Sequence, residues 1–479
     1  MAPSSEPERP PPPPAVSSAN TGLALALGGL GLMADVYDIS ILNLLRPSLV
    51  AHCGPMKPYQ EFTVFAANVA GALIGQPLFG LIADCYGRRH TFVVTAILTA
   101  AASIGCAAAG PIGGLHTYDV LAIMRFLLGV GIGGEYPLAA LNAAENADSV
   151  SSSFMLSVLL VGRFAGALLG CLVVLVLSQF GLTDAALWRS ALGIGAFFAL
   201  SSAVLRAALL SETPMYKALG DDGLSPMSSQ GGALTAMRRT FVGTCGCWLF
   251  FDITNYGLGM FATALFPAEQ GTGTAVTMLT VYGITAPFLL AGVVLAAVAR
   301  MRTLLLVGLG LEFLCYLQLA SVSPQVQATH PEDNSSSFAL LLFALTRGVE
   351  AIGPGMAVFI VPAQVFPTRA RGTAYGLSAS AGRVGAIAGA LIVPYVLEAS
   401  GMSSVMAIMA VVCGMNFVWS WLFVPLYGPA ELDAIFRVDS AGGAVERQAV
   451  VIQRILDEGG AASADGGGGK KEEATPIVA

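Results

Sequence analysis

The chain has 479 residues, of which 55% are hydrophobic and only 11% charged, and its mean hydropathy is +0.73. Soluble domains carry about 25% charged residues, so this composition excludes an ordinary soluble protein and predicts an integral membrane protein. The formal net charge of −7 lies largely in tails and loops, and nothing in the sequence resembles a basic nucleic-acid surface, so nucleic acid is not an expected partner.

The first 21 residues contain a run of prolines and no long apolar stretch. They lack the hydrophobic region of a cleavable signal peptide, so the first membrane span is expected to act as its own insertion signal. Because this composition cannot bury enough apolar surface to fold, we expect residues 1–21 to form a disordered, proline-rich cytoplasmic tail.

The apolar segments that follow predict an all-α integral membrane fold. A helix crosses the hydrocarbon core with about 20 apolar residues, and twelve segments reach that length. The polar stretch 211–238 is expected to be a cytoplasmic linker between two pseudo-symmetric six-helix bundles at 22–210 and 239–426. The predicted spans are 22–44, 62–83, 91–109, 119–141, 154–178, 187–210, 239–263, 275–298, 303–322, 338–361, 372–396 and 403–426.

Lysine and arginine are concentrated in alternate loops. Arg88 and Arg89 follow the second predicted span, Lys217 and Arg238 lie in the linker, and further basic residues lie in the C-terminal tail. Such residues are retained on the cytoplasmic side, so both termini are expected to be cytoplasmic. Residues 427–479 end in a glycine run and a short charged cluster, and we expect them to form an unfolded, low-complexity cytoplasmic tail.

Acidic residues occur inside the apolar segments. Asp35 and Asp38 flank Tyr37 in the first span, and Glu135 lies in the fourth span within RFLLGVGIGGEYPLAAL, residues 125–141. A carboxylate at bilayer depth is costly and is functional by default. It must face a watery cavity, a cation or a proton, which predicts a protein that moves something across the membrane.

The seventh span carries Trp248, Asp252 and Tyr256 at i, i+4 and i+8 spacing. This spacing places the three side chains on one helix face. An aromatic stripe alone more often indicates core packing, but the acid within this stripe favours a binding site.

The two halves are related in sequence. GRFAGA at 162–167 recurs as GRVGA at 382–386, an offset of 220 residues, and Arg125 matches Arg347 at an offset of 222 residues. Two matches at nearly one offset indicate a duplication, as in transporters built from parallel repeats.

The segment GLIADCYGRR at 80–89 resembles the signature of the loop between spans two and three in the major facilitator superfamily. The resemblance implies the major facilitator fold and a cytoplasmic gate formed by Asp84, Arg88 and Arg89. The competing interpretation, a simple positive-inside anchor, accounts for the arginines but not for Asp84.

Two further ionisable residues have more than one interpretation. We group Arg125 with the gate, and the alternative is that it pairs with Glu135 or Glu145 to stabilise the bundle. Glu350 in the tenth span has no assigned role, and Arg347 one turn earlier is a candidate partner.

Within the superfamily, the chain most resembles the phosphate:proton symporter family, over all twelve predicted spans. The motifs that carry this resemblance are MADVYDI at 33–39, RFLLGVGIGGEYPL at 125–138, Trp188-Arg189, Glu212-Thr213-Pro214 with Tyr216, the triad of span seven, and FIVPAQVFPTRARGTAYG at 359–376. The resemblance implies a transporter rather than an enzyme, with no cofactor and no metal site, in the plasma membrane.

The resemblance also implies site residues. The substrate-binding residues are Tyr136, Trp248, Asp252, Tyr256 and Arg383, the last standing where the family usually has lysine. The proton-coupling residues are Asp35, Asp38 and Glu135. A phosphate beside Asp252 or Glu135 would place like charges together and draw in protons, with Arg383 or Arg163 supplying the compensating charge.

Four positions depart from the family pattern. Glu135 replaces an aspartate, Gly355 an asparagine, Gln364 a glutamate and Val161 a glutamine. The GGEYP form also resembles a sister group that carries glycerophosphodiesters such as glycerophosphoinositol. Losing an asparagine and a glutamine removes donors suited to a small anion and leaves room for a larger head group.

The expected function is therefore proton-coupled symport of inorganic phosphate by alternating access, with phosphate, protons and the lipid bilayer as partners. A proton-coupled glycerophosphodiester carrier is the first alternative. A non-transporting phosphate receptor would need long signalling domains, which these tails do not resemble. A sugar or organic-cation carrier is disfavoured by the motifs of spans four and seven.

Overall fold

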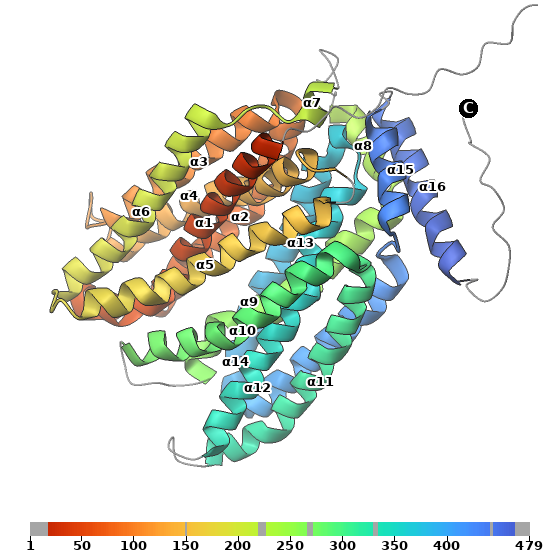
Figure 1. Cartoon of the computed structure of the whole chain (residues 1–479). Helices are drawn as coiled ribbons and strands as arrows, with labels where there is room; N and C mark the ends of the chain where they lie inside the picture. The colour runs from red at the N-terminus through yellow and green to blue at the C-terminus, as the bar shows by residue number, and fades with distance from the viewer. Residues whose placement is uncertain are drawn as a thin grey trace, which may run out of the picture.

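The computed structural model describes residues 18–148, 151–218, 227–265, 272–328, 334–440 and 444–464, and these fold almost entirely as helices (Figure 1). The helices are α1 (Ser18–Cys53), α2 (Pro58–Tyr86), α3 (Arg88–Ala107), α4 (Thr117–Glu145), α5 (Ser152–Ser178), α6 (Asp184–Leu209), α7 (Pro214–Ala218), α8 (Met227–Ala236), α9 (Arg238–Leu265), α10 (Thr272–Val298), α11 (Met301–Ala328), α12 (Asn334–Ile352), α13 (Pro354–Val365), α14 (Thr368–Phe423), α15 (Pro429–Ser440) and α16 (Val445–Ala464).

Ten helical segments of the described chain are long and apolar enough to cross a membrane. One of them, α14, contains the last two predicted spans and bends at Gly401, whose φ of 76° favours glycine. Another is broken at Gly353–Pro354 into α12 and α13, since proline cannot continue the hydrogen-bond ladder of the helix before it. With α9 added, each of the twelve predicted spans lies almost entirely on helix, in agreement with the predicted all-α membrane fold.

The long helices form two groups. Helices α1 to α6 pack with one another, as do α9 to α14, and the groups meet mainly where α2 packs on α14 and α5 on α10. Figure 1 shows them side by side, the first coloured red to yellow and the second green to blue. Many apolar side chains on the outside are exposed, including Phe197 and Val294 at 64% each, as expected for a surface that faces lipid.

The backbones of α2 and α14 come into direct contact between the halves. A Cβ atom on Gly80 would lie 2.2 Å from the carbonyl oxygen of Gly372, and one on Gly376 would lie 2.2 Å from that of Gln76. Any larger residue would separate the helices, so these glycines allow the halves to close against each other.

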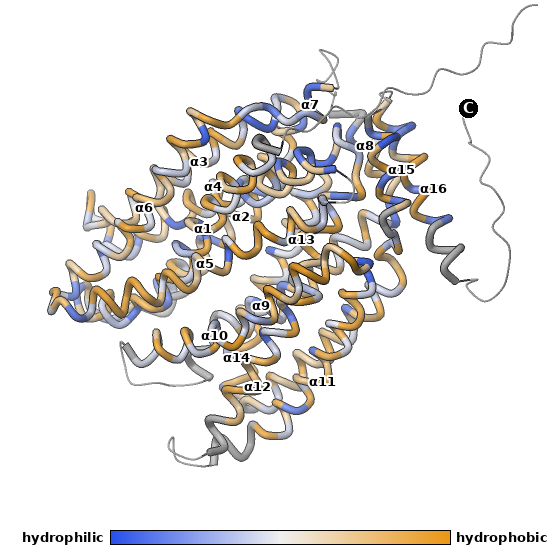
Figure 2. The backbone as a smooth tube through the Cα atoms, in the orientation of Figure 1, coloured by the Kyte–Doolittle hydropathy of each residue, from blue (hydrophilic) through white to orange (hydrophobic). Residues whose placement is uncertain are grey.

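Helices α7, α8, α15 and α16 gather at one end of the molecule, near the start of α1, which we call the linker end (Figure 1). Figure 2 shows hydrophilic residues gathered around α7, α8 and α15 and hydrophobic residues along the long helices. The linker end is therefore more hydrophilic than the long helices.

The expectation of an unfolded C-terminal tail is wrong for residues 429–440 and 445–464, which form α15 and α16. Their apolar side chains, among them Leu432, Ile435, Ile452 and Leu456, are buried. The tail is polar on average, but its few apolar residues recur at helical spacing and form one apolar face on each helix. Burial of these faces is enough to fold the two segments. Residues 465–479 and 1–17 of the expected tails lie outside the described chain, and α1 begins at Ser18, within the segment expected to be unfolded.

Candidate functional site

A cavity of about 250 Å³ lies between the two halves. Helices α1, α4 and α5 supply one wall, and α9, α10, α12 and α13 supply the other. The polar residues that α1 contributes, Ser40 and Asn43, lie in the part of that helix remote from the linker end. The cavity thus lies between the halves and beyond the contacts that close the linker end.

A smaller chamber of about 10 Å³ adjoins this cavity, and Tyr136, Arg163, Tyr256 and Gly355 line both. All five residues predicted to bind substrate line the chamber: Tyr136, Trp248, Asp252, Tyr256 and Arg383. The structure therefore brings together residues of α4, α9 and α14 that are distant in sequence. The chamber has room for about one water molecule, so a larger ligand would occupy the adjoining cavity as well.

Arg383 contacts several other residues that line the chamber. Its Nη1 lies 3.5 Å from Oδ2 of Asp252 and donates a hydrogen bond to Oη of Tyr256. Its guanidinium lies 5.5 Å from the ring centroid of Tyr136 and 5.0 Å from that of Tyr256. The buried Nε makes no hydrogen bond within the described chain, so Arg383 retains a donor for an incoming acceptor.

Arg163 is a second cation of the site. It lines both the chamber and the cavity, with its guanidinium 6.0 Å from the ring centroid of Tyr136. Within the described chain, no ion pair is formed by Arg163 at 4 Å or less. Its charge is therefore held over an aromatic face rather than neutralised by a carboxylate.

The charged residues that line the two cavities are three arginines and two carboxylates: Arg163, Arg347, Arg383, Asp252 and Glu350. With all five ionised, the lining carries an excess of one positive charge. A buried charge in a membrane protein must be compensated, so the site is suited to a small anion.

Aromatic contacts fix the walls of the chamber. Trp248 packs edge-on against Tyr375 at 5.4 Å between ring centroids, and Phe359 packs in the same way against Tyr136 at 5.9 Å and Tyr375 at 6.1 Å. Edge-on aromatic pairs add to the stabilisation that comes from burying apolar area, and they favour one relative orientation of the rings. Tyr136 and Trp248 are therefore held in place before a ligand arrives.

The three predicted proton-coupling acids lie elsewhere, inside the first half. Glu135 forms an ion pair with Arg206 of α6 and accepts a hydrogen bond of 2.8 Å from Oγ1 of Thr95. Asp38 accepts one of 2.8 Å from Oγ of Ser103. Oδ2 of Asp35 and Oδ1 of Asp38 are buried without a hydrogen bond in the described chain.

Glu135 and its neighbour Tyr136 point to different sides of α4, since consecutive residues lie about 100° apart on a helix. Tyr136 lines the cavity, whereas Glu135 turns inward to Arg206. From the sequence we expected that an anion could bind beside Glu135. The structure instead places Glu135 outside the cavity, where it pairs with Arg206. The acids that line the two spaces are Asp252 in the chamber and Glu350 in the cavity.

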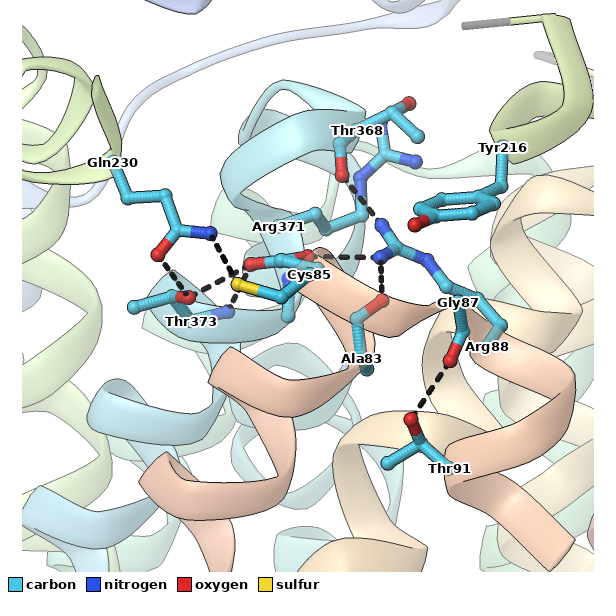
Figure 3. Close-up of polar contacts among 12 residues, drawn as sticks. Ala83, Cys85, Gly87, Arg88, Thr91, Tyr216, Gln230, Thr368, Arg371 and Thr373 are labelled. Atoms are coloured by element: carbon cyan, nitrogen blue, oxygen red, sulfur yellow. Dashed lines mark hydrogen bonds and ion pairs between the residues drawn. The ribbon is translucent and has the colours of Figure 1, made fainter. Parts of the chain in front are cut away.

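The predicted gate residues Asp84 and Arg88 lie where α2 ends and α3 begins, next to the start of α14. Figure 3 shows Arg88 with its neighbours Thr368 and Tyr216. Asp84 accepts hydrogen bonds from the backbone nitrogens of Gly372 at 3.0 Å and Thr373 at 2.7 Å, and from Oγ1 of Thr373 at 2.8 Å. Arg88 pairs with Asp84 at 2.9 Å and donates to the carbonyl oxygen of Thr368. These contacts tie α2 and α3 to the start of α14.

Three more charged residues complete this cluster. Glu145 pairs with Arg88 at 3.0 Å and with Arg371 at 3.4 Å, and Arg371 pairs with Asp439 of α15 at 2.6 Å. We define the linker-end cluster as Asp84, Arg88, Glu145, Thr368, Arg371, Thr373 and Asp439. Asp439 was missed by sequence reasoning because it falls in the tail expected to be unfolded.

Arg89, the third predicted gate residue, lies beside the cluster, and its backbone nitrogen donates to the carboxylate of Glu212 at 3.2 and 3.3 Å. Arg125 lies apart from the cluster. It is 20 residues from Glu145 on α4, about 30 Å along the helix, and donates to the carbonyl oxygen of Asp38 at 2.7 Å. The predicted pairing of Arg125 with Glu135 or Glu145 is wrong, because Glu135 pairs with Arg206 and Glu145 with Arg88 and Arg371. The role of Arg125 in the gate stays a prediction.

Two of the departures from the family pattern also have defined places. Gly355 lines both cavities, so this wall lacks a side chain. Gln364 lies outside them, and its Nε2 donates to Oγ of Ser152 at 3.1 Å and of Ser153 at 3.0 Å across the halves. The predicted partnership of Glu350 with Arg347 is confirmed by their ion pair.

Comparisons with known proteins agree with this architecture. The family model described as "Sugar (and other) transporter" matches residues 30–222 and 234–435. The fold is similar to that of the proton:xylose symporter XylE bound to 6-bromo-6-deoxy-D-glucose, with a TM-score of 0.75 and 17% identity over 88% of this chain and 99% of that one.

Curated relatives cover most of the chain. The inorganic phosphate transporter 1-6 of Oryza sativa subsp. japonica is 27% identical over 76% of this chain and 80% of its own length. The low affinity inorganic phosphate transporter 1 of Petunia hybrida is 27% identical over 77% and 81%. The glycerophosphoinositol permease 1 of Candida albicans is 24% identical over 84% and 78%.

Proposed function

We propose that this chain, which belongs to the sugar (and other) transporter family of the major facilitator superfamily, is a proton-coupled symporter of inorganic phosphate. Its membership and its apolar helices make it a multi-pass membrane transporter. The substrate, the proton coupling, the plasma membrane and the cytoplasmic termini are parts of the proposal.

The observation that carries the proposal is the excess positive charge of the lining between the halves. Arg383 and Arg163 face a space with phenol and indole groups that can donate hydrogen bonds, from Tyr136, Tyr256 and Trp248. Arginine is suited to phosphate because its fork of donors matches two phosphate oxygens at once. The relatives named as inorganic phosphate transporters support the same substrate.

The positions of the cavity and of the linker-end cluster support alternating access. The cluster links Asp84 and Arg88 of the first half to the start of α14, while the cavity lies beyond this closure. With the linker end cytoplasmic, this arrangement is the outward-facing one. Transport then requires the cluster to separate while contacts form at the opposite end.

Proton coupling supplies the charge balance. The lining accommodates one negative charge without further compensation, and each additional negative charge draws a proton to a carboxylate. We assign this role to Asp252 beside the anion and to Asp35, Asp38 and Glu135 within the first half. If more than one proton accompanies a monoanion, an inside-negative potential assists by about 2.3 kcal/mol per charge per 100 mV.

A glycerophosphodiester is the second candidate substrate. The cavity of about 250 Å³ extends well beyond the arginine chamber, and Gly355 leaves its wall open. The relative named as a glycerophosphoinositol permease supports this alternative.

Uptake of radiolabelled phosphate into proteoliposomes tests the proposal. An inward proton gradient is applied with and without a protonophore, and unlabelled glycerophosphocholine is added as a competitor. Gradient-dependent uptake that resists the competitor is the expected result. Uptake of labelled glycerophosphodiester without phosphate uptake would assign the second candidate instead.

A further inference from the structure

The cavity contains an ion pair whose two charges cancel in the lining and to which the proposed function gives no role of its own. Arg347 and Glu350, one turn apart on α12, are joined by a salt bridge, and both line the cavity. Nη2 of Arg347 also donates to Oδ1 of Asn255 on α9 at 2.8 Å. The pair lies beside the chamber, because Asn255 precedes the chamber residue Tyr256 on α9.

The two partners differ in access to the cavity. The side chain of Arg347 is 24% exposed, whereas that of Glu350 is 8% exposed. An anion that enters the cavity can reach the guanidinium of Arg347, while Glu350 remains in the wall. The anion and Glu350 therefore compete for one cation.

The surroundings of Glu350 are mostly unfavourable to a lone carboxylate. The titratable and charged groups that line the same cavity or interact electrostatically with Glu350 are Tyr136 of α4, Arg163 and Cys171 of α5, Asp252 and Tyr256 of α9, Tyr282 of α10, Glu312 and Tyr316 of α11, Arg347 of α12, and Cys413 of α14. Besides Arg347, Arg163 is the cation of this set. When an anion occupies both arginines, Glu350 is left buried beside two other acids.

The neighbouring carboxylate of Glu312 adds to the electrostatic repulsion on an ionised Glu350. The carboxylate of Glu312 is buried, at 1% exposure, and accepts a hydrogen bond of 2.8 Å from Oη of Tyr316. Within the described chain no cation lies within 4 Å of Glu312. Two neighbouring carboxylates without a cation between them do not both stay ionised in a buried site.

From this geometry we propose that Arg347 and Glu350 form an anion-triggered proton site in the second half of the transporter. The entering anion draws Arg347 away from Glu350, and Glu350 takes one proton from the water of the cavity to form a neutral carboxyl group. When the anion leaves, Arg347 returns and the proton is released to the water on that side. The inference rests on the proposed symport and adds a proton carrier to it.

The number of protons taken up per phosphate tests this proposal. Purified protein is reconstituted with a pH-sensitive dye inside the vesicles, and proton and radiolabelled phosphate influx are recorded together. For Glu350→Gln, which mimics the protonated group, the ratio is expected to fall by one proton per phosphate. Phosphate exchange at equal pH on both sides should persist, since it needs no net proton movement.

Two matched variants define the control. Glu398 of α14 is an exposed acid outside the cavity, so Glu398→Gln should leave the ratio unchanged. Glu350→Asp keeps a titratable group and should restore the ratio of the wild type. An unchanged ratio in Glu350→Gln would overturn the proposal.

A variant on the other partner keeps the test decisive if Glu350→Gln does not fold. In Arg347→Gln the carboxyl of Glu350 lacks its cation before phosphate arrives, so phosphate should no longer trigger uptake of this proton. A wild-type ratio in Arg347→Gln would overturn the inference. A wild-type protein that exchanges no phosphate would overturn the proposed function, and the inference with it.

Discussion

Replacing Asp84 with alanine should open the linker end. Asp84 accepts three hydrogen bonds from Gly372 and Thr373 across the halves, and its carboxylate is fully buried. Removing one partner of a buried charged contact costs about 3–5 kcal/mol. Because water replaces these bonds when the end opens, we take about 3 kcal/mol, which shifts the equilibrium toward the open form about a hundredfold.

Distances between spin labels measure this shift. In a cysteine-free background, labels are placed at His90 at the start of α3 and at Arg437 on α15, which are both exposed. Asp84→Ala should move most of the distance distribution to longer values. The matched control is Asp148→Ala, an exposed acid at the same end whose hydrogen bonds are local. A distribution for Asp84→Ala that superimposes on that of the wild type would refute the reasoning.

Three further substitutions test other parts of the structure. Asp439→Asn removes the negative charge that pairs with Arg371. The start of α14 should lose about 1–3 kcal/mol of local stability, measured as faster amide hydrogen exchange there. Unchanged exchange would contradict a stabilising role for this ion pair. Arg383→Gln should weaken phosphate binding by about 2–5 kcal/mol in calorimetry, and Arg383→Lys by less because the charge remains; equal losses would contradict a role for the charge. Arg206→Gln leaves Glu135 buried without its cation and should lower the free energy of unfolding by about 3–5 kcal/mol. Adding Glu135→Gln should recover part of this loss. A double variant that is less stable than Arg206→Gln would contradict the pairing.

The spans could be predicted because they depend on local patterns, whereas the residues of the chamber were predicted from the family resemblance together with such patterns. Apolar length alone places the helices. The spacing of Trp248, Asp252 and Tyr256 fixes one face of α9, and the repeat that contains Arg163 and Arg383 marks corresponding helices of the two halves. The structure brings these faces together at the chamber.

Contacts between distant segments could not be predicted in the same way. The partner of Glu135 is Arg206, 71 residues later in the chain, and no local pattern links them. Asp439 depends on α15 folding against the linker end, where a few buried apolar residues are masked by a polar composition. The position of Arg125, by contrast, follows from the rise per residue of α4, so its separation from Glu145 could have been found from the sequence.

The most direct test of the central claim is an experimental structure of the protein determined in saturating phosphate. The account predicts an anion between Arg163 and Arg383, within hydrogen-bond distance of both, in the space lined by Tyr136, Tyr256 and Trp248. An empty chamber at saturating phosphate, or phosphate bound at another place with Arg383 still paired to Asp252, would contradict it.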